Sequence, residues 1–383
     1  MIQKSILPNY FSRTRILSLL IISILFADNR NHQYQNFDNF IYKALKTSKI
    51  AGIGLSIISK DSILFKKAYG YSDIQLKEKF TLNTIMNIAS ISKTTIGVSI
   101  TYLAEKGLIN LDEDINNFIP FYIENPHAKQ STITLRNLMS HCSGIIDQQE
   151  IYLSEYHYGQ DSPVELGYFL ENYLSQNGNY YSNQNFSTQK PGEVFLYSNI
   201  GSALAAYIVE IISGKPFNVF TKEIIFNNIQ MPNTYWFLSD KKHSRHAKLY
   251  TYNSKEKKLD KIELYGLTTY PDGGLRSSVN DITKYLQYFI NTEFYLKEKI
   301  ISKKGIEGMF SADYFDFYSN FWNIGETIGH GGGDPGVSTG MYYKKEEGIG
   351  YIFMINTSEF SKIKNFEETI IDFGKYLKNL HSK

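Results

Sequence analysis

Short runs of apolar residues predict β-strands near both ends of the chain. Two runs flank the turn sequence Lys60-Asp61-Ser62, and three more follow residue 313. Apolar runs of this length that end at turn residues are typical of strands. The predicted strands are 52–58, 63–70, 316–323, 338–344 and 349–356.

Apolar positions recur at helical spacing in four other segments. These predicted helices are 37–47, 90–106, 200–212 and 364–379, with Gly107 as a stop signal.

The order of these elements predicts an α+β fold. From about 110 to 295 the pattern is mainly helical, and 176–189, rich in Asn, Ser and Gln, is predicted to be a loop. We therefore expect one antiparallel sheet built from both ends of the chain and flanked by terminal helices. A helical lobe of about 110–295 is inserted in it, and ligand sites tend to form in the groove between such parts.

Composition narrows the class of protein. The 383 residues are 42% hydrophobic and 20% charged, which is typical of a globular chain and excludes a disordered one. With 40 Lys+Arg against 38 Asp+Glu, the net charge of +2 gives no reason to expect nucleic acid as a partner. Cys142 is the only cysteine, so no intramolecular disulfide and no cysteine-based zinc site is expected.

The first 27 residues have the layout of a secretory signal peptide. Lys4, Arg13 and Arg15 precede an uncharged apolar run, 16–26, and Ala27 is a small residue suited to a cleavage site. The run is shorter than the roughly 20 apolar residues of a membrane span. We predict an exported protein, periplasmic or secreted, with 28–383 as its hydrolase domain. An uncleaved N-terminal anchor is the alternative and would be its one link to a membrane.

Two short motifs carry candidate chemistry. Ser90 and Lys93 form an S-x-x-K sequence at a predicted helix start, where residues i and i+3 share a face. A serine needs an adjacent base, and a lysine with a lowered pKa can serve as one. Tyr197 and Asn199 form a Y-x-N sequence before the apolar helix, offering a proton-transfer group and an amide. Taken singly, both motifs also fit ordinary helix caps and a surface lysine.

A third motif is rich in glycine. Gly329 to Gly333 read Gly-His-Gly-Gly-Gly, and several glycines let a backbone approach a ligand closely. Such a strand can give an N–H group to an oxyanion hole. A flexible turn with a chance histidine is the alternative for this motif.

The order of the three motifs, at 90, 197 and 330, resembles the serine β-lactamase and penicillin-binding-protein superfamily, in particular its class C-like branch. Further segments are similar to family sequences. They are 133–144 (ITLRNLMSHCSG), 213–217 (SGKPF) with 225–226 and 231–234, 273–277 (GGLRS) with Asp281, and 329–340. The resemblance covers roughly 35–375.

The resemblance implies a β-lactamase/transpeptidase-like fold and a role for each motif residue. Ser90 would be the acylated nucleophile and Lys93 its activator, and Tyr197 would be a proton relay or the base itself. Asn199 would orient Lys93 and a substrate amide. His330, Gly331 and Gly332 would line the substrate site, and the N–H groups of Ser90 and Gly333 would form the oxyanion hole. The implied cycle needs neither a cofactor nor a metal.

One departure from the family pattern limits the functional interpretation. Many family members have Lys-Thr-Gly where this chain has His330-Gly331-Gly332. A histidine is largely neutral near pH 7, and Gly331 lacks the threonine hydroxyl, so efficient penicillin hydrolysis is not implied. We therefore expect a serine hydrolase for an amide or ester: a peptide, a peptide containing D-amino acids, an ester or a β-lactam. The partner would be a small-molecule or peptide substrate, including cell-wall material. The alternative is a penicillin-binding-protein-like or non-catalytic cell-wall peptide-binding module.

Three other readings are less favoured. Gly336 to Gly340 match the G-x-S-x-G nucleophile elbow around Ser338. That motif requires an acid and then a histidine later in the chain, and the only histidine after Ser338 is His381, near the end of the sequence. Cys142 next to His141 is better explained as a packed cysteine. His243 and His246 lie in a basic run, which favours a solvated loop over a metal site.

Overall fold

The computed structural model describes residues 31–240, 245–291, 300–358 and 363–381. The segment predicted as a signal peptide, 1–27, lies outside these residues, so its export role stays a prediction.

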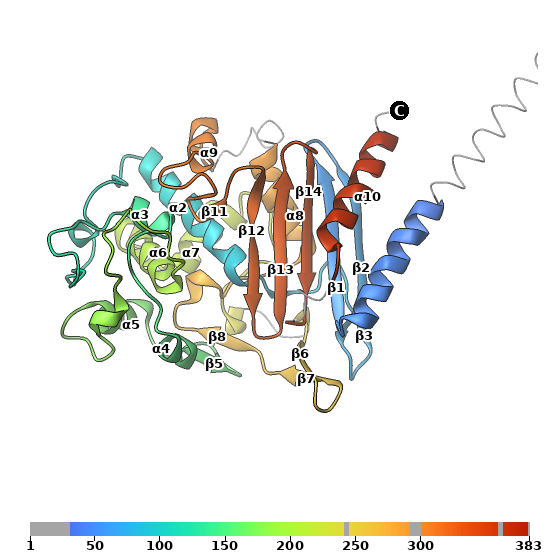
Figure 1. Ribbon diagram of the computed structural model, residues 1–383, viewed down its shortest axis with the longest axis horizontal. Helices are drawn as coiled ribbons and strands as arrows, with labels where there is room; N and C mark the ends of the chain where they lie inside the picture. The colour runs from blue at the N-terminus through green and yellow to red at the C-terminus, as the bar shows by residue number, and fades with distance from the viewer. Residues whose placement is uncertain (1–30, 241–244, 292–299, 359–362, 382–383) are drawn as a thin grey trace, which may run out of the picture.

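One large sheet, made of strands from both ends of the chain, forms the centre of the molecule (Figure 1). In the described part of the chain it has eight strands, and every neighbouring pair is antiparallel. In spatial order the strands are β10 (Tyr318–Ser319), β11 (Trp322–Asn323), β12 (Thr327–Asp334), β13 (Val337–Lys344), β14 (Ile349–Ile355), β1 (Gly52–Ser59), β2 (Ile63–Asp73) and β3 (Glu78–Lys79). Because β1 pairs with β14, the predicted sheet built from both ends of the chain is confirmed.

Helices cover both faces of this sheet, which explains its continuous apolar strands. Every residue of β1 and β14 is buried. A helix at 31–47 and α10 (Phe366–His381) pack on one face, and α8 (Val279–Ile290) packs against β1, β13 and β14. Side chains alternate between two cores: Leu55 and Phe353 belong to the core under the terminal helices, and Ile352 belongs to the other. A strand buried on both faces needs an apolar residue at each position.

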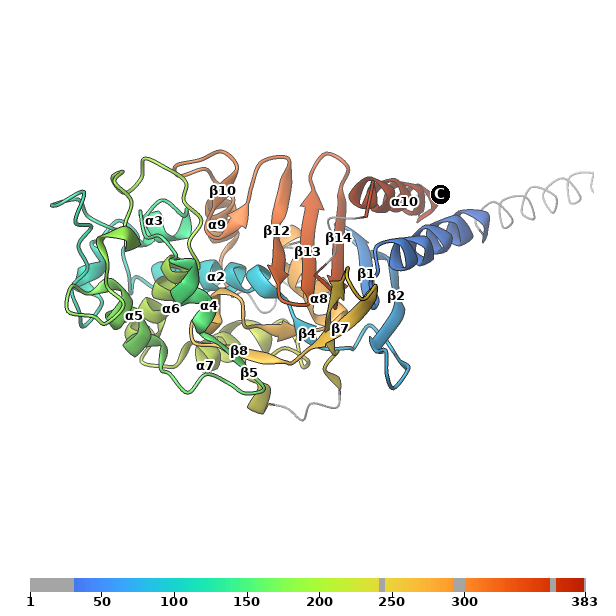
Figure 2. The same cartoon turned by 60° about the horizontal axis from the view of Figure 1, so that its bottom comes forward.

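The helical lobe lies beside the β12 end of the sheet (Figure 2). At its centre α6 (Asn199–Ser213) packs against α2 (Lys93–Glu105). Residues 200–206 of α6 are all buried, as its apolar sequence predicts. Ser198 caps its start, and Gly214, with φ +65°, ends it. The other helices are α3 (Leu135–Met139), α4 (Gln149–Ser154), α5 (Leu166–Leu174), α7 (Phe217–Thr221) and α9 (Lys303–Met309).

Short two-stranded sheets are present in addition to the main sheet. They are β4 (Met86–Asn87) with β9 (Arg276–Ser277), β5 (Tyr156–Tyr158) with β8 (Tyr265–Leu267), and β6 (Leu249–Asn253) with β7 (Lys258–Ile262). The segment 110–295, predicted as the lobe, therefore also contains short strands, and its last helix, α8, packs on the sheet.

Two predicted elements are divided in the structure. The strand predicted at 316–323 is a tight hairpin of β10 and β11, because Asn320 and Phe321 both have positive φ and reverse the chain. The helix predicted from Ser90 starts as a 3₁₀ turn, η1 (Ala89–Ser92), before it continues as α2. Gly107, with φ +70°, follows the end of α2 as predicted.

Among the described residues, no single helix is long and apolar enough to cross a membrane. Asn199–Ser213 and Phe217–Phe226 meet that requirement only as a pair, and the chain bends by 80° between them.

We predict that Phe373→Ala in α10 lowers the free energy of unfolding by about 3–5 kcal/mol. The Phe373 ring stacks on Phe37 at 4.2 Å between centroids and meets Phe65 edge-on, so it joins both terminal helices to the sheet. Equilibrium denaturation in urea measures the change. Leu76→Ala, at a side chain that is 68% exposed, is the control and should change stability by less than about 0.5 kcal/mol. Equal effects of the two substitutions would contradict the packing described here.

Candidate active site

The S-x-x-K motif lies on a strained turn between the two parts of the molecule. Ala89 has φ +48°, a left-handed backbone conformation that is uncommon for alanine. The backbone N–H of Ile88 donates to the carbonyl of Leu275 at 2.9 Å and fixes the start of this turn. Ser90 is half-buried in the first turn of η1, where N–H groups have no partner within the helix. The turn therefore presents both the hydroxyl and the N–H of Ser90.

A fully buried lysine connects this turn to two other segments. Lys93 is 0% exposed, and its Nζ lies 3.2 Å from Ser90 Oγ, 2.7 Å from Asn199 Oδ1 and 2.8 Å from the carbonyl oxygen of Asp272. An ammonium group has three N–H donors, and these three oxygens match them in number. The predicted pairing of Lys93 with Ser90 and Asn199 is present in the structure.

The surroundings of Lys93 favour its charged form. Burial alone would lower the pKa of the lysine, but Tyr197, Asp272 and Asp147 outweigh it and raise that pKa above its usual value. This differs from the sequence-based expectation, in which a lowered pKa makes Lys93 a base. The structure instead gives a lysine that donates hydrogen bonds in the resting state.

An aspartate that the sequence motifs did not include holds the Y-x-N segment in place. Asp147 Oδ1 accepts from the hydroxyl of Ser198 at 2.7 Å and from the N–H of Ile200 at 3.1 Å. Its Oδ2 accepts from the N–H of Asn199 at 2.7 Å. A carboxylate at a helix start satisfies free N–H groups and interacts favourably with the helix dipole. Asp147 thus fixes the position from which the Asn199 side chain reaches Lys93.

Tyr197 precedes this helix start and is 41% exposed, with its ring beside the lysine. Lys93 Nζ lies 5.0 Å from the centre of the Tyr197 ring. His141 also packs against this tyrosine: its ring centroid is 4.2 Å away, and its Nδ1 accepts from the N–H of Ser198 at 3.1 Å. His141 therefore positions Tyr197 through both packing and a backbone bond.

The glycine-rich motif forms the end of β12. This strand passes directly beside η1, the turn that carries Ser90. β11 pairs with β12 only at Gly329, so from His330 onward β12 has β13 on one side and η1 on the other. A Cβ at Gly332 would lie 2.5 Å from the carbonyl oxygen of Ile88 and 2.4 Å from Thr339 Oγ1. Only glycine permits this approach. Gly333, where a Cβ would meet nothing within 4 Å, is open.

His330 is in this region, but its ring is fully engaged with protein. It is 5% exposed, and its Nδ1 donates to the carbonyl of Gly331 at 2.5 Å, since a carbonyl can only accept. Nε2 then accepts from the hydroxyl of Tyr318 at 3.0 Å. Burial lowers the pKa of His330 to about 4, so the ring is neutral at pH 7. In place of the substrate contact expected from the sequence, His330 holds β10 against β12.

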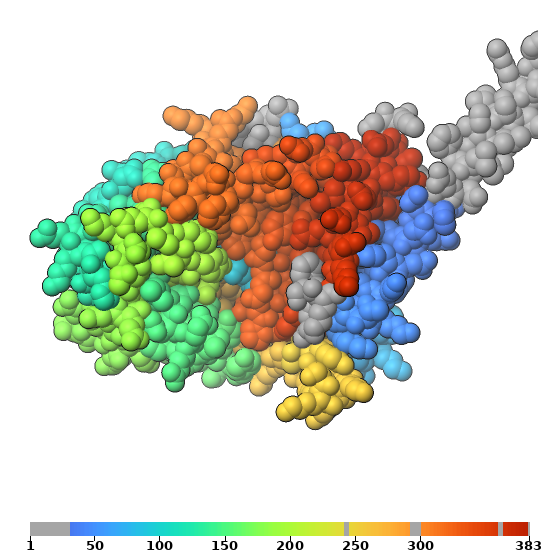
Figure 3. All heavy atoms as spheres, in the orientation of Figure 1, coloured from blue at the N-terminus to red at the C-terminus, as the bar shows by residue number. Residues whose placement is uncertain are grey.

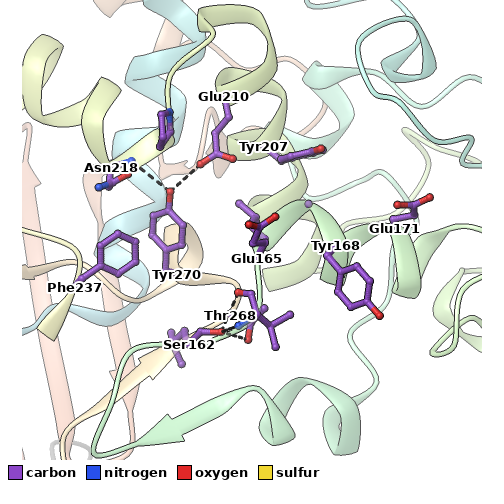
Figure 4. A pocket seen from close by; sticks show the side chains of 15 residues that line it. Ser162, Glu165, Tyr168, Glu171, Tyr207, Glu210, Asn218, Phe237, Thr268 and Tyr270 are labelled. Atoms are coloured by element: carbon purple, nitrogen blue, oxygen red, sulfur yellow. Dashed lines mark hydrogen bonds between the residues drawn. The ribbon is translucent and has the colours of Figure 1, made fainter. Parts of the chain in front are cut away.

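The carbonyl of Asp272 is the third acceptor of Lys93, and the residues that hold its segment in place line a neighbouring cavity (Figure 4). Asp272 ends the short helix η7 (Tyr270–Asp272). The hydroxyl of Tyr270 donates to Glu210 Oε1 at 2.9 Å, and Glu210 is on α6. Figure 4 shows both side chains in the wall of a cavity of about 600 Å³ that contains none of the predicted catalytic residues. This cavity wall connects η7 to the helix that carries Asn199.

The space-filling view shows where substrate can approach. In Figure 3 a narrow hollow separates the green lobe from the orange strands, and cyan atoms from the chain near residue 100 are visible at its bottom. Figure 3 thus shows a hollow between lobe and sheet, as the sequence predicts.

The less favoured candidates are structural. Ser338 is inside β13, not on a strand-to-helix turn, and its hydroxyl donates to the carbonyl of Thr357 at 2.9 Å. Cys142 is buried, and burial raises the pKa of its thiol to about 11, so it is not a thiolate at pH 7. No group of three or more metal-ligating side chains exists among the residues that the structure describes; His243 lies outside them.

Comparison with known proteins identifies the family. The family model named Beta-lactamase matches residues 37–371. The chain belongs to the beta-lactamase family. Penicillin-binding protein 4* of Bacillus subtilis (strain 168) is 25% identical over 336 residues, covering 82% of this chain and 69% of the relative.

Solved structures agree in fold. An octameric penicillin-binding protein homologue from Pyrococcus abyssi has a TM-score of 0.69 at 26% identity, covering 88% of this chain and 77% of that one. D-amino acid amidase from Ochrobactrum anthropi SV3, complexed with L-phenylalanine amide, has a TM-score of 0.67 at 20% identity, covering 91% and 100%. The fold is thus the predicted β-lactamase/transpeptidase-like α+β fold, in a family of serine hydrolases.

We predict that Gly332→Ala lowers kcat/KM by about 100-fold, the size of effect expected when an oxyanion donor is displaced. The new methyl group would overlap Ile88 and Thr339 and push β12 away from Ser90. Hydrolysis of a 4-nitrophenyl ester measures the loss. Gly308→Ala, where a Cβ meets nothing within 4 Å, is the matched control and should keep full activity. Full activity in Gly332→Ala would show that the close approach has no role.

Asp147→Asn should lower both stability and turnover. The amide NH₂ cannot accept, so at least one bond to Ser198, Asn199 or Ile200 is lost, at about 1 kcal/mol. We expect kcat to fall about tenfold because the start of α6 shifts. Asp114→Asn, which changes another cap far along the chain from the motifs, should affect stability alone. Thermal unfolding and steady-state kinetics on both variants separate the two effects.

Proposed function

We propose that this protein is an exported serine hydrolase that cleaves an amide or ester through an acyl-enzyme on Ser90. The supporting observation is the buried Lys93, bonded at once to Ser90 Oγ and Asn199 Oδ1 beside Tyr197. Burying a charged group costs free energy, and a lysine with only a structural role at the protein surface would not need to be buried. An S-x-x-K pair that only capped a helix would leave its lysine in solvent.

Each step of the proposed cycle has a residue in place. The substrate carbonyl enters the hollow with its oxygen toward the N–H groups of Ser90 and Gly333, which stabilise the charge that develops there. Ser90 Oγ attacks the carbonyl carbon and loses its proton. The leaving amine or alcohol takes up a proton and departs, and water then releases the acyl group from Ser90.

We assign the proton transfers to Tyr197 and the electrostatic work to Lys93. The environment that raises the pKa of Lys93 keeps it as a donor to Ser90 Oγ. The Tyr197 ring lies beside this cation, and a tyrosine hydroxyl in that position can relay a proton from the serine. The partly exposed position of Tyr197 lets it pass that proton to a leaving group.

The family branch and the substrate class of this hydrolase are also part of the proposal. The motif order favours the class C-like branch, and candidate substrates are peptides, peptides with D-amino acids, esters and β-lactams, including cell-wall material. A penicillin-binding-protein-like or non-catalytic cell-wall peptide-binding role is the second candidate. The neutral, engaged His330 weighs against recognition of a substrate carboxylate, so we place ordinary amide or ester hydrolysis first.

The test is covalent labelling of residues 28–383. A fluorophosphonate and, separately, a fluorescent penicillin are added, and mass spectrometry locates the adduct. We expect a fluorophosphonate adduct on Ser90 that is absent in Ser90→Ala and at least about 100-fold slower in Lys93→Ala and Tyr197→Phe.

Ser311→Ala, at an exposed serine, is the matched control and should label normally. An adduct on Ser338, or no adduct on the folded protein, would overturn the proposal. A stable penicillin adduct with no ester hydrolysis would favour the second candidate.

A further inference from the structure

Among the described residues, Lys93, His330 and Arg276 of the motif region are already engaged with protein atoms. The three N–H donors of Lys93 are taken by Ser90, Asn199 and Asp272, and His330 is neutral. Arg276, which is 1% exposed, donates to the carbonyls of Trp236, Gly274 and Tyr265. None of these groups is available to a substrate carboxylate.

A carboxylate lies at the C-terminal end of the glycine-rich segment, and His330 lies near its N-terminal end. Asp334 is the last residue of β12 and follows Gly333 directly. It is half-buried, and its Oδ1 accepts from the hydroxyl of Tyr156 at 2.6 Å. The space above Gly273 places it near the nucleophile: a Cβ there would lie 3.4 Å from Asp334 Oδ2 and 3.9 Å from the carbonyl carbon of Ala89. Asp334 Oδ2 and the backbone of Ala89, the residue before Ser90, therefore both lie close to Gly273.

This carboxylate has no positive partner of its own. None of the ion pairs between the described residues includes Asp334. Burial, reinforced by repulsion from Asp272, raises the pKa of Asp334 to about 7. Asp272 itself is 1% exposed and its Oδ2 has no hydrogen-bond partner in the described structure. Lys93 and Arg276 favour the charged form of Asp334 through space, but in the described structure the hydrogen bonds of both cations go to other residues.

We propose that Asp334, supported by Tyr156, binds a positively charged amino group on the acyl part of the substrate. The position next to Gly333 fits an amine a few bonds from the scissile carbonyl, as in an amino acid amide or a peptide with a free N-terminus. The ammonium group supplies the cation that Asp334 lacks, and Tyr156 and Asp334 supply acceptors for its N–H groups. A substrate anchored by a carboxylate would meet repulsion at the same place. This assignment of substrate class rests on the proposed Ser90 hydrolase.

The experiment compares three substrates that differ only in the amine. They are phenylalanine 4-nitroanilide, its N-acetyl derivative and 3-phenylpropionyl 4-nitroanilide, each amino acid in both enantiomers and all at neutral pH. We expect kcat/KM for the free amine to exceed that for the phenylpropionyl compound by at least about tenfold, the value of one charge-assisted hydrogen bond. Asp334→Asn should remove this advantage and leave the phenylpropionyl rate within about threefold.

Two further variants keep the test sharp. Asp61→Asn makes the same chemical change in an exposed turn and should preserve the free-amine advantage. Tyr156→Phe, which leaves Asp334 in place but removes its hydrogen bond, should reduce the advantage and serves if Asp334→Asn fails to fold. An amine advantage that is absent in the native protein, or unchanged in Asp334→Asn and Tyr156→Phe, overturns the inference.

A binding measurement separates this inference from the proposed function. Titration calorimetry on Ser90→Ala compares phenylalanine amide with 3-phenylpropanamide, so it needs no turnover. Preferential binding of the amine that is lost on adding Asp334→Asn supports the amine site even if Ser90 proves not to be acylated. Fluorophosphonate labelling of Ser90 without any amine preference leaves the hydrolase intact and rejects the amine site.

Discussion

The burial of one ammonium group is the constraint on which the site depends. Lys93 is removed from water, and a buried cation is tolerated only where enough acceptors surround it. Its three acceptors come from three distant segments: the nucleophile turn, the start of α6, and η7. Each segment must therefore be positioned to within hydrogen-bond distance. The helix cap by Asp147 and the Tyr270–Glu210 bond are the supports that hold two of them there.

The second constraint is steric. β12 lies against the turn that carries Ser90, and the oxyanion hole that we propose requires this close approach of a backbone N–H on the strand to one on the turn. Gly332 permits this contact, since a Cβ would collide with the backbone of Ile88. Ala89 accommodates it from the other side by adopting a strained positive φ. Thr339, on the next strand, ties the two together by donating to the Ile88 carbonyl at 2.8 Å.

The charges around the cleft follow from what each group already binds. Both ring nitrogens of His330 and the ammonium group of Lys93 form hydrogen bonds with protein atoms, so neither side chain is free to bind an anion. Asp334, which accepts from Tyr156 and forms no ion pair in the described chain, is the group that we propose binds a cation. A sheet made from both ends of the chain brings these groups together, since it places β12 beside a turn that follows β4.

Sequence alone determined the fold class and the identity of the motif residues. Sequence signals are strong where a single helix or strand determines the structure. Apolar runs predicted β1 and β14, and Gly107 predicted the end of α2. The S-x-x-K spacing predicted that Ser90 and Lys93 share one face. Tertiary structure decided what depends on neighbours from elsewhere in the chain. The raised pKa of Lys93, the bonded ring of His330, and the roles of Asp147 and Asp334 have no local signature, because burial and charge depend on residues far away in sequence.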